Sequence, residues 1–437
     1  DGNFDTNEVG IEDVRVELYY DTNDNGIYDP GVDLAVEDDD SNPRFEVTDA
    51  DGYYRFDDLG GEDYIVVIPS TNFNENTDPL VGYLSSGTSM DGSGTVSDSI
   101  GPDPDDDTDN EDNGVTTFSG NTVDYVSAQT VTLGPDQSEP TDDDDPTTNP
   151  ETGEAINDQS NRTVDFGFYR QELGNLVFHD VITADGAYSS GTDDLVEGVT
   201  VQIFSSDGSG NAIAEIPVGP DGIWGTDDDV AGGIETGVNG EYRFSGLPDG
   251  SYIVKVTPPG YRSTIDTADQ SDTDDPDINT DHNDNGVGEG EGTIASNEVT
   301  LTPGSDGAAS NNEVTNSSGT TYNPTVDFGL IPIVSIGSIV WEDTNRDGEQ
   351  TAGEPGIAGA EVTLLDGSGT PVAGVSPQTT GADGLYYFGS LPEGDYQVQV
   401  ELPAGTDYYP TINQNSAADD DSENDSNIAD SNGLIYT

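Results

Sequence analysis

Aromatic and aliphatic residues alternate with polar ones at period two in a segment that occurs three times. The copies run from Thr48 to Ile68, from Thr236 to Val256 and from Thr380 to Val400, with the same internal spacing. In each copy an Asp-Gly or Asn-Gly turn signal precedes Tyr-x-Phe, and a second alternating run, Tyr-x-Val-x-Val or Tyr-x-Val-x-Ile, follows. Such alternation places one set of side chains on one face of a strand. The pattern predicts two antiparallel strands joined by a short turn, in each of three homologous β domains.

Further apolar runs flank each copy and extend the repeat. Opening strands are predicted at Leu173–Asp180 and Ile336–Asp343. Second strands are predicted at Asp13–Leu18, Gly198–Ile203 and Gly359–Leu364, and closing strands at Thr163–Phe168 and Thr325–Leu330. No convincing amphipathic helix is present, and Gly, Pro, Asn and Asp turns separate the strands. Together these features predict an all-β protein built of β-sandwich domains.

The repeats divide the chain of 437 residues into three domains, at about 1–170, 173–331 and 335–437. The apolar run from Leu330 to Trp341 is too short to span a bilayer, and it is interpreted as a linker plus a strand. The first domain lacks the opening strand and the third lacks the closing strands. We expect something to complete them. Continuation of the polypeptide past both ends is favoured over strands donated by adjacent subunits, because a start inside a loop is unusual for natural processing.

Charge restricts the function. The chain carries 90 Asp and Glu against 9 Lys and Arg, a formal net charge of −81. Binding to nucleic acid or to an anionic membrane needs a basic surface, so both are excluded. Such a charge repels itself unless cations neutralise it. Disorder and a salt-adapted surface are two simple interpretations of this charge. A hydrophobic content of 31% leans toward disorder, whereas the threefold repeat argues for a folded core. No cysteine is present, so disulfides and thiol chemistry are absent.

One acidic loop matches a calcium-loop pattern, D-x-[DN]-x-[DN]-G-x5-E, at every position. Its candidate ligands are Asp343, Asn345, Asp347, Glu349 through its backbone carbonyl, and Glu354. Calcium prefers six to eight hard oxygen ligands in loose geometry, which this loop supplies. Strands rather than helices flank the loop, so it lies outside the EF-hand fold. The alternative is a solvated acidic turn, and the metal site is favoured.

Two other stretches resemble this loop in part. The first domain begins inside it, with Asp1, Asn3, Asp5 and Glu8 at the later positions. The copy in the second domain keeps Asp180, Asp185 and Asp193 with altered spacing, and there metal site and plain turn stay equally open.

A second type of acidic loop follows the second strand and also places oxygens at alternate positions around a glycine. In the first domain its candidate ligands are Asp21, Asn23, Asn25, Asp29 and Asp33. In the second domain they are Asp221, Asp227 and Asp229. Both are interpreted as calcium sites.

An acidic tract after each repeated segment ends in Asn-Gly. Its candidate ligands are Asp105, Asp107, Asp109 and Asp112 in the first copy, Asp274, Asp277, Asp281 and Asp284 in the second, and Asp421, Asp425 and Asp430 in the third. A charge run is usually a solvated surface. Recurrence at one place in the fold favours calcium.

Catalysis finds little support. The two histidines, His179 and His282, have no recurring partner and are interpreted as surface residues. No nucleotide-binding glycine loop occurs. Trp224 and Trp341 could face a sugar, although core packing is favoured for Trp341.

The repeated segment, the opening Val-Trp-Glu-Asp-Thr-Asn-Arg-Asp-Gly at Val340–Gly348 and the closing Thr-Val-Asp-Phe-Gly resemble a known family. This is the SdrD B-like, calcium-binding B-type domain of serine–aspartate-repeat surface proteins, related to collagen-adhesin B-type domains. The resemblance implies prealbumin-like or immunoglobulin-like sandwiches, secretion, display on a prokaryotic cell surface, and a stalk role with calcium stiffening each module. Some relatives cross-link a strand lysine to an asparagine, but no lysine occupies an opening strand here.

The sequence therefore predicts a non-enzymatic, extracellular structural protein of calcium-rigidified repeats, with possible self-association into a fibre. Two alternatives stay open. One is an adhesin in which one module binds a carbohydrate or host protein, and the other is a spacer attached to a secreted enzyme.

Overall fold

The computed structural model describes residues 8–75, 77–99, 101–105, 111–134, 161, 163–180, 186–264, 284–287, 292–301, 314–315, 321–391, 394–409, 411 and 434–436. Within these ranges the protein is all-β, and the single helical element is a 3-10 turn, η1 (Ser70–Asn72). The predicted fold class is confirmed. No described helix has the length and apolarity needed to cross a membrane. We name the three predicted domains repeats 1, 2 and 3.

Strands are present at most of the predicted segments, but only the last residue of the predicted Thr163–Phe168 strand is in a strand, and many short strands were not predicted. Repeat 1 contains β1 (Arg15–Tyr20), β2 (Leu34–Ala35), β3 (Phe45–Val47), β4 (Asp63–Pro69), β5 (Leu84–Ser85), β6 (Ser89–Met90), β7 (Val96–Ser97), β8 (Val115–Ser119), β9 (Thr122–Ser127), β10 (Val131–Thr132) and β11 (Phe168–Tyr169). Repeat 2 begins with β12 (Gln171–His179), β13 (Asp194–Leu195), β14 (Thr200–Ser206), β15 (Ala212–Glu215), β16 (Ile234–Glu235), β17 (Glu241–Ser245) and β18 (Gly250–Thr257). It continues with β19 (Tyr261–Ser263), β20 (Gly286–Val287), β21 (Ile294–Ser296), β22 (Val299–Leu301), β23 (Val314–Thr315), β24 (Thr321–Asn323) and β25 (Phe328–Pro332). Repeat 3 contains β26 (Val334–Ile339), β27 (Glu361–Asp366), β28 (Gln378–Thr379), β29 (Leu385–Leu391), β30 (Tyr396–Glu401) and β31 (Leu434–Tyr436).

Repeat 2 contains two sheets. In one, β12 pairs with β17 antiparallel and with β24 and β25 parallel. In the other, β14 and β18 are the central pair, flanked by β15, β21 and β22. Phe178, Phe244, Phe328, Tyr252 and Ile203 are fully buried in this repeat. The alternation of apolar residues in the sequence therefore supplies the core positions of a β-sandwich, as predicted.

The predicted hairpin within each repeated segment is wrong. In repeat 2, β17 pairs with β12 whereas β18 pairs with β14 in the other sheet. In repeat 3, β29 pairs with β26 and β30 with β27. The connection after β17 contains Leu247, which is fully buried, so the chain passes from one sheet to the other and does not fold back on itself. A period-two pattern identifies the strands but not their partners.

The first threonine of each repeated segment makes the same two hydrogen bonds in all three copies. Its hydroxyl donates to the carbonyl of Ile11, Val196 or Ile357 at 2.6–2.7 Å. It accepts the amide of Val14, Val199 or Ala360 at 2.9–3.0 Å. The threonines Thr48, Thr236 and Thr380 are buried. Each one ties the start of the second strand to the segment before it, which explains why threonine opens the repeat.

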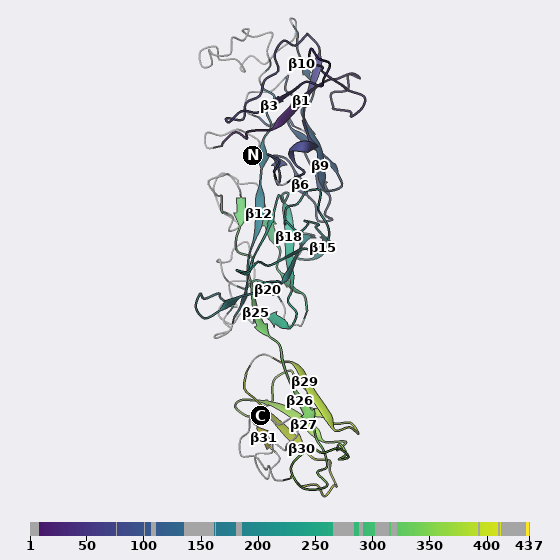
Figure 1. The fold of residues 1–437 in the computed structure, drawn as a ribbon, viewed down its shortest axis with the longest axis vertical. Coiled ribbons are helices and arrows are strands. Elements are labelled where there is room, and N and C mark those ends of the chain that lie inside the picture. Colours follow the sequence, from purple (N-terminus) through teal and green to yellow (C-terminus); the bar gives the residue numbers. More distant parts are fainter. Residues whose placement is uncertain are drawn as a thin grey trace. The chain divides into compact units, whose positions relative to one another are not determined.

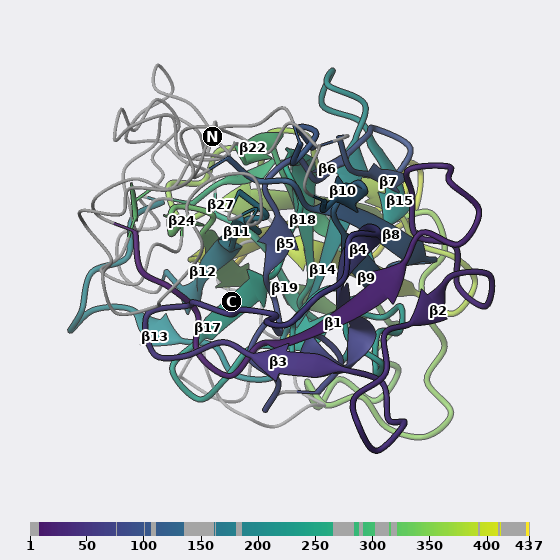
Figure 2. The same ribbon diagram turned by 90° about the horizontal axis from the view of Figure 1, so that it is seen from above.

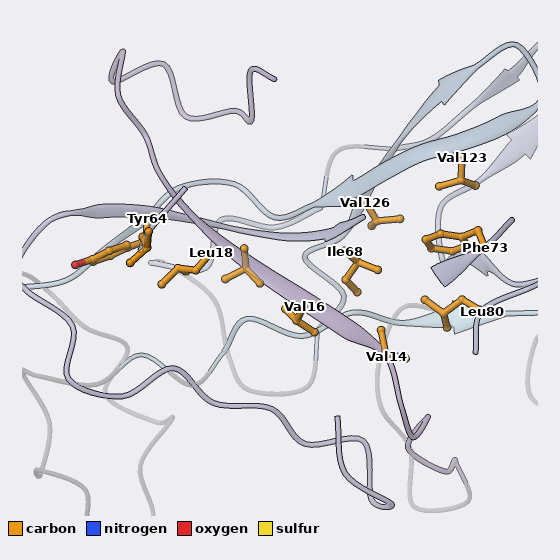
Figure 3. Packing of buried hydrophobic residues seen from close by; sticks show 11 residues of the cluster. Val14, Val16, Leu18, Tyr64, Ile68, Phe73, Leu80, Val123 and Val126 are labelled. Carbon is orange, nitrogen blue, oxygen red and sulfur yellow. The ribbon is translucent and has the colours of Figure 1, made fainter. Parts of the chain in front are cut away.

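Repeat 1 has one large sheet in the order β2-β1-β4-β9-β8, with β3 beside β2 along the same edge of β1 (Figure 2). Its core joins β1, β4 and β9 with the segment that follows η1, and Leu18, Ile68, Phe73 and Val126 pack there (Figure 3). Tyr53–Asp57, the counterpart of β17, is not a strand. Tyr54 and Phe56 in this segment are partly buried against the core, so the aromatic positions keep their packing role.

The chain divides into two compact units. The first comprises Asp1–Pro259 and Ser263–Leu330, and the second Gly260–Arg262 and Ile331–Thr437. The second unit contains the β26–β29 pair and the sheet β28-β27-β30-β31 (Figure 1). Its core includes Val362, Leu364, Phe388, Leu391 and Val398. The strands β25 and β26 are separated by Ile333 alone, so the predicted linker from Leu330 is mostly strand. The three-domain boundaries stay a prediction.

Neighbouring residues on β29 give a matched test of the core. Phe388 is 3% exposed and Tyr387 is 62% exposed. Phe388→Ala should lower the free energy of unfolding of the second unit by about 3–5 kcal/mol, because it removes a buried ring and leaves a cavity. Tyr387→Ala should cost far less. Urea unfolding of the two variants measures the difference, and equal losses would contradict the assignment of faces.

Candidate metal-binding loops

The loop from Asp343 to Glu354 connects β26 to β27 and is folded around its own carboxylates. Asp343 Oδ2 accepts the amide of Gly348 at 3.0 Å, and Gly348 has a φ of 80°, which favours glycine. Glu354 Oε1 accepts the amide of Thr344 at 2.9 Å, and its Oε2 accepts the amide of Thr351 at 2.8 Å. The first and last predicted ligands thus fix the two ends of the loop.

The Asp21–Asp33 loop, which the sequence placed in a different class, has the same hydrogen-bond scheme. Asp21 Oδ2 accepts the amide of Gly26 at 2.9 Å, and Gly26 has a φ of 82°. Asp33 Oδ1 accepts the amide of Thr22 at 2.9 Å, and Oδ2 accepts that of Asp29 at 2.7 Å. Asp21 and Asp33 are 6% and 5% exposed, so these carboxylates belong to the interior of the loop.

The Asp180–Asp193 loop, for which the sequence left metal site and plain turn open, keeps the ends of this scheme. Asp180 Oδ2 accepts the amide of Gly186 at 2.9 Å, and Asp193 Oδ2 accepts that of Ser189 at 2.6 Å. Both aspartates are buried. The altered spacing has therefore not removed the closing interactions.

Hydrogen bonds keep the first aspartate of two loops ionised. Burial alone would raise the pKa of Asp21, but the Thr130 hydroxyl and the amides of Gly26 and Asn25 outweigh it and lower the pKa. At Asp343, burial is likewise outweighed by the amides of Gly348, Arg346 and Asp347, and the pKa is lowered. A carboxylate that stays charged in the folded loop is a competent cation ligand.

Asparagine amides lie against the carboxylates inside the loops. Asn345 Nδ2 donates to Asp347 Oδ2 at 2.8 Å. Asn23 and Asn25 both donate through Nδ2 to Asp29 Oδ2, at 2.8 and 2.7 Å. Rotation of such an amide by 180° would direct its oxygen to the same place, where a cation would offset the repulsion between two oxygens. The predicted ligands are therefore already neighbours.

No three acidic or histidine side chains among the described residues are grouped closely enough to hold an ion by themselves. A cation in these loops would also draw on asparagine and backbone oxygens, which is how calcium loops reach six or more ligands. The donor set is all oxygen, so it suits a hard cation such as calcium.

The Asp221–Asp229 loop shares only the closing half of the scheme. Asp229 Oδ2 accepts the amide of Gly225 at 2.9 Å, four residues earlier, as Asp33 and Asp193 do. Asp221 accepts the amide of Ile223, and Asp227 is exposed. Burial raises the pKa of Asp229 to about 7, with Asp221 and Asp228 adding to it, and a nearby cation would lower that pKa again.

Trp224, in this loop, is 1% exposed, so it offers no platform for a sugar. Trp341 is partly buried, and His179 is a partly buried residue of β12 rather than a surface one.

One aspartate of each of the first two acidic tracts lies near a candidate loop. In repeat 1, Thr132 of β10 donates its amide to Asp105 at 3.1 Å, while the hydroxyl of Thr130 donates to Asp21 at 2.6 Å. In repeat 2, the amide of Asp284 donates to the carbonyl of Gly186 at 2.7 Å. Two classes of predicted site that are far apart in the sequence are therefore adjacent in both repeats.

The Asp-Asn-Gly ends of the tracts also have a structural role that the sequence did not reveal. Asp112 and Asp284 each accept, at 2.8 Å, the amide of the glycine two residues later. Burial raises the pKa of Asp112 to about 6. The next residue, Asn113 or Asn285, accepts through its side-chain oxygen the amide of Asp165 or Asp327 in the closing segment, at 2.9 and 2.8 Å. The shared Asp-Asn-Gly and Thr-Val-Asp-Phe motifs were a signal for this contact.

Glu8, the last position of the partial loop in repeat 1, is exposed. The remaining candidate residues lie outside the described part of the chain: Asp1, Asn3, Asp5, Asp107, Asp109, Asp185, Asp274, Asp277, Asp281, His282, Asp421, Asp425 and Asp430.

Comparison with known proteins agrees with the resemblance seen in the motifs. Residues 334–437 match the family of SdrD B-like domains. The chain is homologous to serine-aspartate repeat-containing protein F of Staphylococcus epidermidis, with 33% identity over 267 residues, which cover 60% of this chain and 13% of that protein. It is also homologous to the bone sialoprotein-binding protein of Staphylococcus aureus, with 35% identity over 241 residues, covering 50% and 17%. The chain thus spans less than a fifth of the length of these relatives. These relatives are bacterial cell-surface proteins, and the second is named for binding bone sialoprotein.

Among solved structures, a streptococcal ancillary pilin aligns with 68% of this chain and 74% of its own, at 16% identity and a TM-score of 0.23.

Loss of the Asn285 side chain should destabilise repeat 2. Asn285 is fully buried, and its oxygen is the acceptor for the amide of Asp327. Asn285→Ala leaves that amide without its acceptor, which costs about 1–3 kcal/mol. The exposed Asn211, whose side chain caps a surface turn, provides the control variant Asn211→Ala. Thermal unfolding of both variants tests this, and an equal change in Tm would contradict it.

Proposed function

We propose that this chain is part of an extracellular structural protein, in which calcium rigidifies β-sandwich repeats of a cell-surface stalk or fibre. The observation that carries the proposal is the shared scheme of the Asp21, Asp180 and Asp343 loops. In each, an aspartate accepts the amide of a glycine with positive φ, and a second carboxylate closes the loop. The same construction in three repeats indicates a shared ligand rather than three unrelated turns.

The excess of negative charge gives a physical reason for calcium binding. Only 9 basic residues oppose 90 acidic ones. Four of the basic residues, Arg15, Arg55, Arg170 and Arg243, pair with Glu17, Asp57 and Glu172, which are not candidate ligands. A divalent cation at each loop would neutralise carboxylates that otherwise repel one another. It would also hold together segments that come from distant parts of the sequence, such as the Asp284 turn and the Asp180 loop.

The strand order of repeat 2 suits a stalk. Its first strand, β12, and its last strand, β25, are parallel neighbours, with Val177 opposite Phe328 and His179 opposite Leu330. Tension applied at the start of β12 and the end of β25 would slide these strands along each other. All their shared hydrogen bonds would then resist together, whereas a strand peeled from its end loses them one at a time.

An adhesin module that binds a carbohydrate or a host protein is the alternative. Burial of Trp224 removes one candidate platform for a sugar. Tyr387, Tyr408 and Tyr409 are exposed aromatic rings on the described surface of repeat 3. Binding of a soluble glycan that is lost in Tyr387→Ala but not on calcium removal would favour this alternative.

Calcium removal should lower stability. A ligand that binds only the folded state adds roughly 2.7 kcal/mol at a hundredfold excess over its Kd, and several sites add further. Excess chelator should therefore lower Tm, and added calcium should restore it while equimolar magnesium does so less well. An unchanged Tm in chelator would refute the proposal.

A pair of aspartates in repeat 3 separates ligands from turn residues. Asp347 lies inside the candidate loop, whereas Asp366 accepts the amides of Ser368 and Thr370 in a surface turn. Asp347→Ala should weaken calcium binding at least tenfold because the site loses an oxygen and a charge. Asp366→Ala should leave the affinity unchanged. Calorimetric titration of each variant with calcium measures the two affinities, and equal affinities would exclude Asp347 as a ligand.

A further inference from the structure

Repeat 1 carries a hairpin that reaches onto repeat 2. It comprises residues 88–97 with strands β6 and β7, and we call it the clasp. The amide of Met90 donates to the carbonyl of Asp249 at 2.7 Å, and Ser89 forms a parallel bridge with the same residue. At the tip, the carbonyl of Gly92 accepts the hydroxyl of Ser205 at 3.2 Å. Asp249 and Ser205 belong to the β14–β18 sheet region of repeat 2, so the clasp joins the two repeats through backbone and side chain alike.

A tyrosine strengthens the base of the clasp. The hydroxyl of Tyr169 donates to the carbonyl of Thr88 at 2.6 Å and accepts the amide of Asp249 at 3.3 Å. Burial raises the pKa of Tyr169, so the hydroxyl stays neutral and keeps its proton for Thr88. One side chain therefore connects the clasp, the end of repeat 1 and the turn before β18.

Other contacts across the same junction are buried. Trp224 of repeat 2 packs against Phe118 of β8, with ring centroids 6.0 Å apart. Glu172 is 2% exposed and is paired with Arg170 and Arg243, so two of the chain's few basic residues neutralise it. Thr88, Met90 and Ser205 are also buried. Interfaces between domains of one chain usually permit relative motion, whereas this junction is filled with core-like side chains.

The connecting chain is short as well. Only Arg170 separates β11 from β12, and its guanidinium donates to the hydroxyl of Ser245 at 3.1 Å. We propose that the clasp fixes repeats 1 and 2 to each other, so that they form one rigid segment and the junction cannot bend. The inclusion of both repeats in a single compact unit agrees with this. The clasp contains no candidate metal ligand, so this rigidity has a source separate from calcium.

Gly92 allows the clasp to be opened without touching either core. A Cβ atom on Gly92 would lie 2.9 Å from the carbonyl oxygen of Ser206 and 3.1 Å from the Cα of Asp207, both in repeat 2. The side chain introduced by Gly92→Val would clash with these atoms and so push the clasp away from repeat 2. Thr95→Val, an exposed change on the same hairpin, is the matched control. Tyr169→Phe keeps the ring and removes only the bridging hydroxyl. If Gly92→Val does not fold, Tyr169→Phe still tests whether the clasp holds the two repeats together.

The chain has no cysteine, so spin labels can be placed at Asp39→Cys in repeat 1 and Val238→Cys in repeat 2, both exposed positions. Pulsed electron paramagnetic resonance in calcium should give one narrow distance distribution for the parent and for Thr95→Val. Gly92→Val should at least double its width, and Tyr169→Phe should broaden it in the same direction. A broad distribution in the parent, or an unchanged width in both junction variants, would overturn the proposal. Failure of chelation to lower Tm would instead refute the calcium proposal and leave the clasp standing.

Discussion

Repulsion among carboxylates is the constraint on which the rest of this structure depends. A chain with a net charge of −81 folds only if its acidic groups are kept apart, hydrogen-bonded or neutralised. The candidate metal-binding carboxylates lie in loops, whereas the buried positions of the sheets are mostly Val, Ile, Leu and aromatic residues. Within the loops, backbone amides supply the positive ends of dipoles that the missing lysines and arginines do not. The carboxylates that open and close each loop each accept one or more amides, so part of their charge is compensated locally.

Local compensation is also what orders the oxygen atoms. A carboxylate that accepts two amides, as those of Asp33 and Glu354 do, is held in one orientation. Asparagine side chains complete the set at Asp29 and Asp347. Under the proposed function, this local order would leave little further ordering of the chain for calcium binding to impose. Side-chain oxygens also accept backbone amides at the ends of the acidic tracts, where Asn113 and Asn285 bind the tract to the closing segment.

Many of the strands and loops could be predicted from the sequence, because the same pattern occurs in three repeats. Alternation identified the longer strands, such as β12, β14 and β18, but not short ones such as β6 and β20. Spacing identified the loops that share a hydrogen-bond scheme. The pairing partners of the strands could not be predicted from the sequence, because β17 and β18 alternate equally well and their partners, β12 and β14, lie far away in the sequence. The clasp was also invisible, because Ser89–Ser97 occurs in one repeat and its contacts depend on another repeat. The hydroxyls of Tyr54 and Tyr242, which donate to the carbonyls of Val164 and Val326, explain in retrospect why Tyr-x-Phe and Thr-Val-Asp-Phe recur together.

The central claim is that the shared loops are calcium sites, and anomalous diffraction from crystals grown in calcium tests it most directly. The account predicts an anomalous peak within about 2.3–2.6 Å of oxygens from Asp343, Asn345, Asp347 and Glu354, with equivalent peaks at the Asp21 loop. The Asn345 amide should then direct its oxygen, not its nitrogen, toward the ion. Well-ordered loops at saturating calcium with no anomalous peak, and with the Asn345 amide still donating to Asp347, would contradict it.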